Sequence, residues 1–191
     1  GLAGACLLGL IFSAVVVFRY KPVRKNLLAD IFLGRAENIS LNRGRIDIKM
    51  WLYMVGAVLL ELNVLSFAAH QNITFGELSS PGILIATLLL TWFVTEYMFF
   101  ERVHLYTYDI FAERVGFKLG WGCLVFYPFF YTIPLWSTVH LPDPGLSSLY
   151  YILPVIIFLT GWGLARGANM QKYHFKKDPD KRFLWIKPES I

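Results

Sequence analysis

Charged residues are scarce in this chain. Only 16% of its 191 residues are charged and 56% are apolar, whereas about a quarter of the residues in a soluble domain are charged. Such a composition cannot cover a soluble surface and excludes an ordinary soluble domain. Aromatic residues, at 17%, are abundant, as is typical of membrane proteins, where they anchor at the interfaces.

The chain also lacks the short motifs of common soluble enzymes. It has no GxGxxG after a strand pattern, no P-loop, no GxSxG and no HExxH. Its two cysteines, Cys6 and Cys123, lie in separate apolar runs, without CxxC or Cys/His metal spacing. We therefore predict no disulfide and no metal site. Any nucleotide must bind through another architecture.

Long apolar runs are present instead. Each is close to the ~20 residues that a helix needs to cross ~30 Å of hydrocarbon, and lipid favours helices because it offers the backbone no hydrogen-bond partner. The runs are Gly1–Phe18, Met50–Ala69, Ile83–Phe100, about Leu119–Val139, and Leu146–Ala165. We predict an all-α, multi-pass membrane bundle of five helices in one domain, residues 1–191. Because the first run begins at once, we expect the natural start to be missing.

The fourth run is irregular, because it holds Gly120, Gly122, Pro128 and Pro134. Proline removes a backbone hydrogen bond and kinks a helix. We therefore predict a kinked or broken helix there, with neighbouring protein satisfying the freed backbone groups.

The 18 Lys and Arg residues occupy alternate connections. In chain order, the four connections between the runs hold eight, none, three and none of them, and the tail after the fifth run holds seven. The positive-inside rule places the three basic segments in the cytoplasm. A missed or invented span would break this alternation, so it supports five spans. Topology explains the net charge of +5 better than nucleic acid does, and we predict no nucleic-acid partner.

Two carboxylates and one side-chain amide lie inside the apolar runs. Glu61 and Asn63 are in the second and Glu96 is in the third. An ionisable residue in a span costs roughly 2.5–3.5 kcal/mol and by default marks a functional site. A functional role is favoured for Glu96. For Glu61, a partner on a neighbouring helix explains the residue equally well.

The connection at residues 101–110 is too polar to cross a membrane. It carries Glu101, His104, Tyr108 and Asp109, which are good proton donors and acceptors. An interfacial helix with aromatic anchors explains it as well, and spacing alone favours that interpretation.

A basic face follows the last run. If the helix continues until Pro179, then Arg166, Asn169, Lys172 and Lys176 fall within one ~120° face. Such a face suits a phosphate-bearing ligand. It equally suits anionic lipid headgroups, and the residues leave both open.

The basic segment also carries a resemblance. Residues 166–179, RGANMQKYHFKKDP, resemble the RGANxQKxxFRxNP signature of the sterol reductase family, which includes sterol C14-reductases, the lamin B receptor and 7-dehydrocholesterol reductase. Further segments agree with the family pattern in order: residues 28–35 with 46–50, residues 96–110, and residues 116–131. The resemblance covers almost the whole chain.

The resemblance implies reduction of a carbon–carbon double bond in a sterol by NADPH, through protonation of the alkene and hydride transfer. It implies a sterol substrate, contact with membrane lipid, and residence in the endoplasmic reticulum of a eukaryote or the inner membrane of a bacterium. The implied cofactor-binding residues are Lys172 and Lys176, with Asn169 and Arg166. The implied candidates on the sterol side are Glu96, Glu101, Asp109 and Tyr131.

The chain departs from the family pattern at three positions. Lys176 replaces an arginine, Cys123 an acidic residue and Pro134 a glutamine. The family pattern also continues past Ile191 through regions that supply much of the cofactor pocket, so we expect the chain alone to be incomplete. One alternative is a non-catalytic sterol-binding or scaffolding protein. A transporter using Glu61 and Glu96 is another, against which the lack of an inverted repeat argues.

Overall fold

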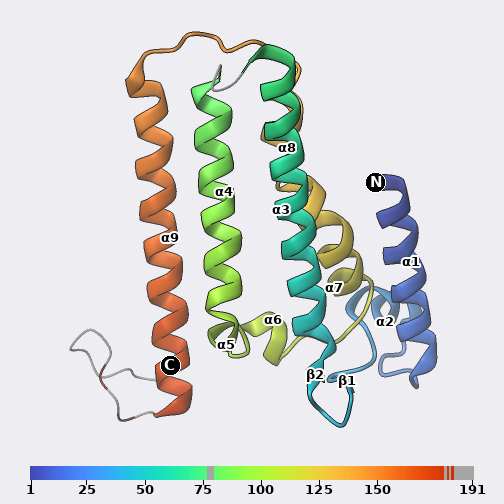
Figure 1. Ribbon diagram of the computed structural model, residues 1–191. Coiled ribbons are helices and arrows are strands. Elements are labelled where there is room, and N and C mark those ends of the chain that lie inside the picture. Colours follow the sequence, from blue (N-terminus) through green and yellow to red (C-terminus); the bar gives the residue numbers. More distant parts are fainter. Residues whose placement is uncertain (77–79, 179, 181, 183–191) are drawn as a thin grey trace.

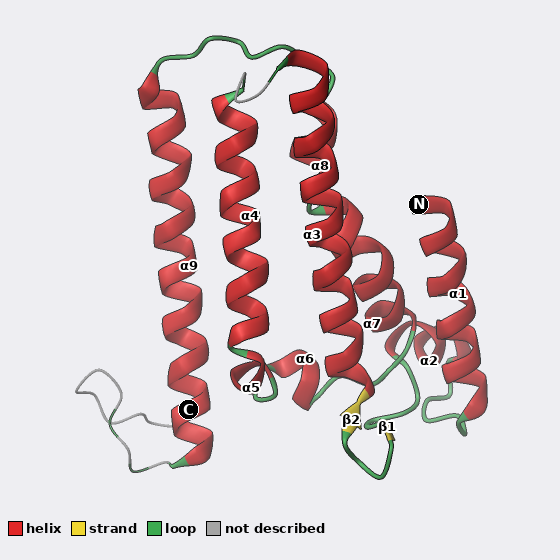
Figure 2. Ribbon diagram, in the orientation of Figure 1, coloured by secondary structure: helices red, strands yellow, loops and turns green. Residues whose placement is uncertain are grey.

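The chain folds as an all-α membrane bundle, as predicted. The computed structural model describes residues 1–76, 80–178, 180 and 182, without the side chains of residues 109 and 111. Helices dominate, and the strands form one small hairpin (Figure 2). The elements are α1 (Leu2–Arg19), α2 (Leu27–Leu33), β1 (Ser40–Leu41), β2 (Ile46–Asp47), α3 (Ile48–Phe75), α4 (Pro81–Phe99), α5 (Glu101–His104), α6 (Tyr108–Phe111), α7 (Phe117–Trp121), η1 (Gly122–Phe130), α8 (Ile133–Thr138) and α9 (Ser148–Lys177).

Five segments of the described residues are long and apolar enough to cross a membrane: α1, α3, α4, the stretch Phe117–Thr138, and α9. They match the five predicted runs, with two differences in length. Helix α3 continues to Phe75, beyond the predicted Ala69. Helix α9 continues to Lys177 and includes most of the basic segment. It ends at the extended Asp178, because the proline that follows disfavours a helical conformation in the residue before it.

The fourth span is broken, as predicted. It consists of α7, the π-helix η1 and the short helix α8. Pro128 lies inside η1, and the side-chain amide of Asn63 on α3 donates to its carbonyl at 2.9 Å. The hydroxyl of Thr132 donates to the carbonyl of Phe129 at 2.7 Å. Asn63 therefore satisfies one backbone carbonyl of the irregular segment, which explains a polar residue inside α3.

Helix α3 packs closely on η1 through Gly56. A Cβ atom at Gly56 would lie 2.5 Å from the carbonyl oxygen of Cys123 and 2.9 Å from the ring of Tyr127. Leu52 and Leu60, also on α3, are fully buried on either side of this contact. The glycine thus brings η1 against α3 and fixes the position of Cys123 and Tyr127.

The basic connections and the C-terminal end of α9 lie together at one end of the bundle, which we call the basic end (Figure 1). Helices α2, α5 and α6 and the hairpin are at this end. The arrangement agrees with the predicted one-sided distribution of Lys and Arg.

A buried carboxylate organises the first connection at the basic end. Asp30 is fully buried and accepts from the backbone N–H groups of Val23 and Arg24 and from the guanidinium of Arg35, each at 3.0 Å. Burial alone would raise the pKa of Asp30, but these hydrogen bonds and the charge of Arg35 outweigh it and lower the pKa below its usual value. The loop is therefore tied to an ionised Asp30.

Lys49, at the start of α3, ties the two basic connections together. Its side chain is almost fully buried, and its ammonium donates to the carbonyls of Ile110 and Glu113 at 2.7 Å each. Cations that indicate topology in the sequence thus also hold the loops in place.

Candidate functional site

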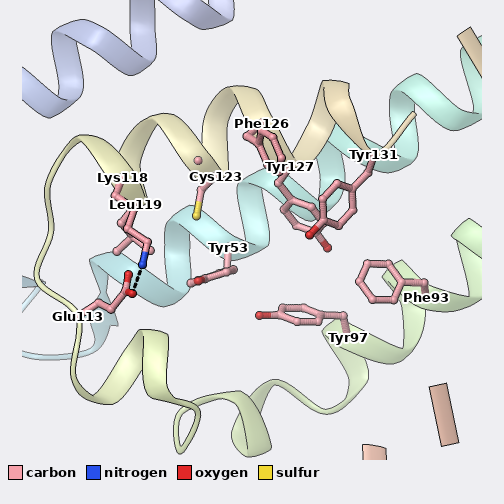
Figure 3. Close-up of a pocket in the computed structure, with 11 residues that line it drawn as sticks. Tyr53, Phe93, Tyr97, Glu113, Lys118, Leu119, Cys123, Phe126, Tyr127 and Tyr131 are labelled. Atoms are coloured by element: carbon pink, nitrogen blue, oxygen red, sulfur yellow. Dashed lines mark hydrogen bonds and ion pairs between the residues drawn. The ribbon is translucent and has the colours of Figure 1, made fainter. Parts of the chain in front are cut away.

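A pocket of about 410 Å³ lies between α3, α4 and the α7–η1 segment. We call it the aromatic pocket, because rings form most of its wall: Tyr53, Phe93, Tyr97, Phe126, Tyr127 and Tyr131. Figure 3 shows Tyr53 and Tyr97 facing each other across it, with Tyr127 and Tyr131 beside Phe93 at one end. The rings of Tyr127 and Tyr131 meet edge to face at 5.1 Å. A flat apolar ligand fits such walls, and the phenols can donate protons to it.

The other end of the aromatic pocket is polar. Glu113 and Lys118 form an ion pair there, drawn as a dashed line in Figure 3. The buried Cys123 lies between this pair and the rings. The pocket therefore has a charged end near the basic end of the bundle and aromatic walls along the rest of it.

A second pocket, of about 420 Å³, lies between α4, α5 and α9. We call it the interhelical pocket. Glu96, His104, Trp162, Arg166 and Asn169 supply its polar groups, and its remaining wall is mostly apolar. The rings of Phe93 and Tyr97 line both pockets, so they form the partition between them.

Glu96 and Arg166 pair across the interhelical pocket. The guanidinium of Arg166 contacts the carboxylate of Glu96, and both side chains are largely buried. The same guanidinium lies over the ring of Phe100, at 4.3 Å from its centroid. The pair joins α9 to α4 and gives the ionisable group inside the third span its partner. Glu61 also finds a neighbouring helix, because the hydroxyl of Thr91 on α4 donates to it at 2.8 Å.

His104 is a site residue that sequence reasoning noted only as one of several proton donors and acceptors in residues 101–110. Its ring stacks on Tyr97, with centroids 3.6 Å apart, and only 3% of it is exposed. Burial, helped by the nearby positive charge of Arg166, lowers the pKa of His104 to about 4. The imidazole is therefore neutral at pH 7. A lone histidine in a polar connection gives no signal of such a contact.

The other predicted residues on the sterol side are not brought together. Residues 101–110 form the short helices α5 and α6 at the basic end. Glu101 is exposed and lines a separate groove beside β2 and the start of α3. Asp109 lies in α6, and its side chain lies outside the described residues. Glu96 lines the interhelical pocket and the half-exposed Tyr131 lines the aromatic one.

The predicted basic face of α9 divides into two pairs. Arg166 and Asn169 line the interhelical pocket. Lys172 and Lys176 lie farther along α9 and are exposed, and the ammonium of Lys176 donates to the carbonyl of Tyr106 at 3.2 Å. Glu96 neutralises Arg166, so the two lysines are the exposed cations of this face.

Comparison with known proteins gives consistent matches. A family profile described as the ergosterol biosynthesis ERG4/ERG24 family matches residues 14–191. The Delta(14)-sterol reductase of Methylotuvimicrobium alcaliphilum is 35% identical over 164 residues, which cover 83% of this chain and 36% of that protein. The Delta(14)-sterol reductase of Arabidopsis thaliana is 33% identical over 177 residues, covering 90% of this chain and 45% of that protein. The 7-dehydrocholesterol reductase of Xenopus laevis is 31% identical over 168 residues, covering 87% of this chain and 35% of that protein. The chain thus spans less than half the length of these relatives.

Proposed function

Because the chain belongs to the ergosterol biosynthesis ERG4/ERG24 family, the family of sterol reductases such as its relatives, we propose that it forms part of an NADPH-dependent enzyme that reduces a carbon–carbon double bond in a sterol. The aromatic pocket is the observation that carries this proposal. It provides apolar walls and phenolic donors inside a membrane bundle, where a sterol is soluble.

Reduction would begin with proton transfer from a side chain to the alkene. Tyr131, at the end of the aromatic pocket opposite the Glu113–Lys118 pair, is the donor that we propose; its O–H proton goes to one alkene carbon and leaves a positive charge on the other. The faces of the surrounding rings stabilise a cation by their quadrupoles. Bound NADPH would supply the hydride that completes the reduction.

The exposed pair on α9 fits the phosphates of the cofactor. Lys172 and Lys176 are four residues apart and therefore adjacent on one helical face, and ammonium groups bind phosphate as point charges. Asn169 would contribute its amide one turn closer to the interhelical pocket. Arg166 would act mainly through its ion pair with Glu96. We propose that this end of α9 faces the cytoplasm, with the protein in the endoplasmic reticulum of a eukaryote or the inner membrane of a bacterium.

An assay of the full-length protein tests the activity. Membranes that contain it are incubated with NADPH and sterols unsaturated at the Δ14, Δ7 or Δ24 position, and the products are followed by mass spectrometry. The Δ14 substrate comes first, because two of the relatives are named Delta(14)-sterol reductases. We expect Tyr131→Phe to lower kcat by about 10²–10⁴-fold, and Tyr150→Phe, an exposed position on α9, to change little. Failure to reduce any of the three sterols would overturn the proposal.

One observation favours a second candidate. Cys123 is buried in the aromatic pocket at the position where the family pattern has an acidic residue. A protein without that carboxylate could bind sterol without reducing it. Saturable sterol binding without NADPH-dependent product formation would favour this non-catalytic role.

A further inference from the structure

Buried polar atoms without partners converge on the interhelical pocket. The indole N–H of Trp162, Nε and Nη1 of Arg166, and Nε2 of His104 make no hydrogen bond to any described residue. Trp162, Arg166 and His104 all line the pocket. Oε1 of Glu96 also makes no hydrogen bond to a described residue, but its charge is compensated by the ion pair with Arg166. A buried polar group left unsatisfied costs about 1–3 kcal/mol, so four such atoms around one cavity indicate a molecule that satisfies them.

The chemistry of these atoms selects the ligand. Trp162 and Arg166 present N–H donors, and the neutral ring of His104 can present an acceptor nitrogen. Glu96 neutralises the charge of Arg166, so the pocket has no net positive charge to favour a phosphate or carboxylate. A hydroxyl group accepts two hydrogen bonds and donates one. It therefore satisfies three of the four atoms, namely two of the three donors and the one acceptor.

The rest of the pocket selects the body of the ligand. Beyond Trp162, its wall consists of apolar residues, among them Phe93, Ile157 and Phe158. Ile157 and Arg166 are nine residues apart on α9, which is about 13 Å along the helix. Ile157 and Gly161 line the pocket and are also exposed, so it opens at the side of a membrane-spanning helix. The hydroxyl end lies toward the basic end of the bundle, as the hydroxyl of a membrane sterol lies toward the interface.

We propose that the interhelical pocket captures a sterol from the adjoining leaflet by its free hydroxyl group. Trp162 and Arg166 donate to the hydroxyl oxygen, and His104 accepts its proton in a hydrogen bond. This inference rests on the proposed function, since it names the part of the sterol that the protein recognises. It makes the free hydroxyl, rather than the double bond, the determinant of capture.

Binding of a saturated sterol separates capture from reduction. The full-length protein, in nanodiscs without NADPH, is titrated with cholestanol and with its 3-methyl ether, which cannot donate a hydrogen bond. We expect cholestanol to bind about tenfold more tightly, as one buried hydrogen bond predicts. His104→Phe keeps an aromatic ring but removes the acceptor, and it should reduce this preference by about threefold or more. Trp162→Phe keeps an aromatic ring but removes a donor to the oxygen of either sterol, and it should weaken the binding of both by about threefold or more.

Trp92→Phe is the matched control. Its ring packs against Trp162 with centroids 5.4 Å apart but does not line the pocket, so both affinities and the preference should persist. A cholestanol probe with a photoreactive diazirine on the ring system should label residues 157–166. Equal affinity for the two sterols, or labelling confined to residues 122–131, would overturn the proposal. Loss of sterol reduction with the preference intact would overturn only the proposed function.

Discussion

Helices α3 and α9 are both long membrane spans, but they are held in different ways. Helix α3 contributes the fully buried Leu52 and Leu60 and approaches η1 through Gly56. The structure describes every residue of α9, and none of them is as fully buried as these leucines. Instead, α9 is attached by the Glu96–Arg166 pair and by ring contacts such as Trp92–Trp162. Apolar packing thus fixes one wall of the site, and polar and aromatic contacts fix the other.

The largest expected effect is on the attachment of α9. Arg166→Met would leave Glu96 buried without its counter-charge, and we expect a loss of about 3–5 kcal/mol in the free energy of unfolding. Equilibrium unfolding of the full-length protein in mild detergent measures it. The double variant Glu96→Gln/Arg166→Met should recover much of the loss. If the single variant is as stable as the double one, the pair does not hold α9.

His104 makes the packing of α4 and α9 around the interhelical pocket sensitive to pH. Its pKa is about 4 in the folded protein and about 6.5 when unfolded, so the unfolded state binds more protons between these values. Stability is therefore complete above about pH 6.5 and falls as the pH drops toward 4, by about 3 kcal/mol in all. Thermal unfolding from pH 7.5 to 4.5 measures this loss. His104→Gln should flatten the profile, and an unchanged profile would assign the pH dependence to other groups.

Alanine at two glycines contrasts the two helices directly. Gly56→Ala places a Cβ 2.5 Å from a backbone carbonyl, and we expect a loss of about 1–3 kcal/mol in the free energy of unfolding. Gly163→Ala on α9 meets no atom within 4 Å and should gain up to about 1 kcal/mol from helix propensity. Urea unfolding of the two variants side by side tests the contrast. Equal effects would mean that α3 and α9 are packed alike.

The smallest effect concerns the exposed lysines of α9. Lys172→Ala should weaken NADPH binding to the full-length protein by about fivefold to tenfold at low salt, because a phosphate contact is lost. The difference should shrink as salt screens the exposed charge. Lys21→Ala, an exposed position in the first connection, is the control. Titration calorimetry at two salt concentrations measures both, and equal affinities would assign Lys172 to lipid contact.

The sequence predicted the spans but not their neighbours. Hydropathy and the alternation of charge predicted five helices, and the glycines and prolines predicted the broken fourth one, because these signals are local. The partner of Glu96 is Arg166, seventy residues away, and periodicity does not indicate which helices pack together. Lys49 was interpreted only as a topology signal. Its buried contacts with Ile110 and Glu113 depend on how two loops meet.

The partition between the two pockets has a thermodynamic consequence. Phe93 and Tyr97 belong to both linings, so a ligand that shifts either ring in one pocket alters the shape of the other. The two occupancies are then linked, and each ligand must change the affinity of the other by the same factor. His104 stacks on Tyr97. A proton that binds to its imidazole is therefore a third ligand, and its binding is linked to the occupancy of both pockets.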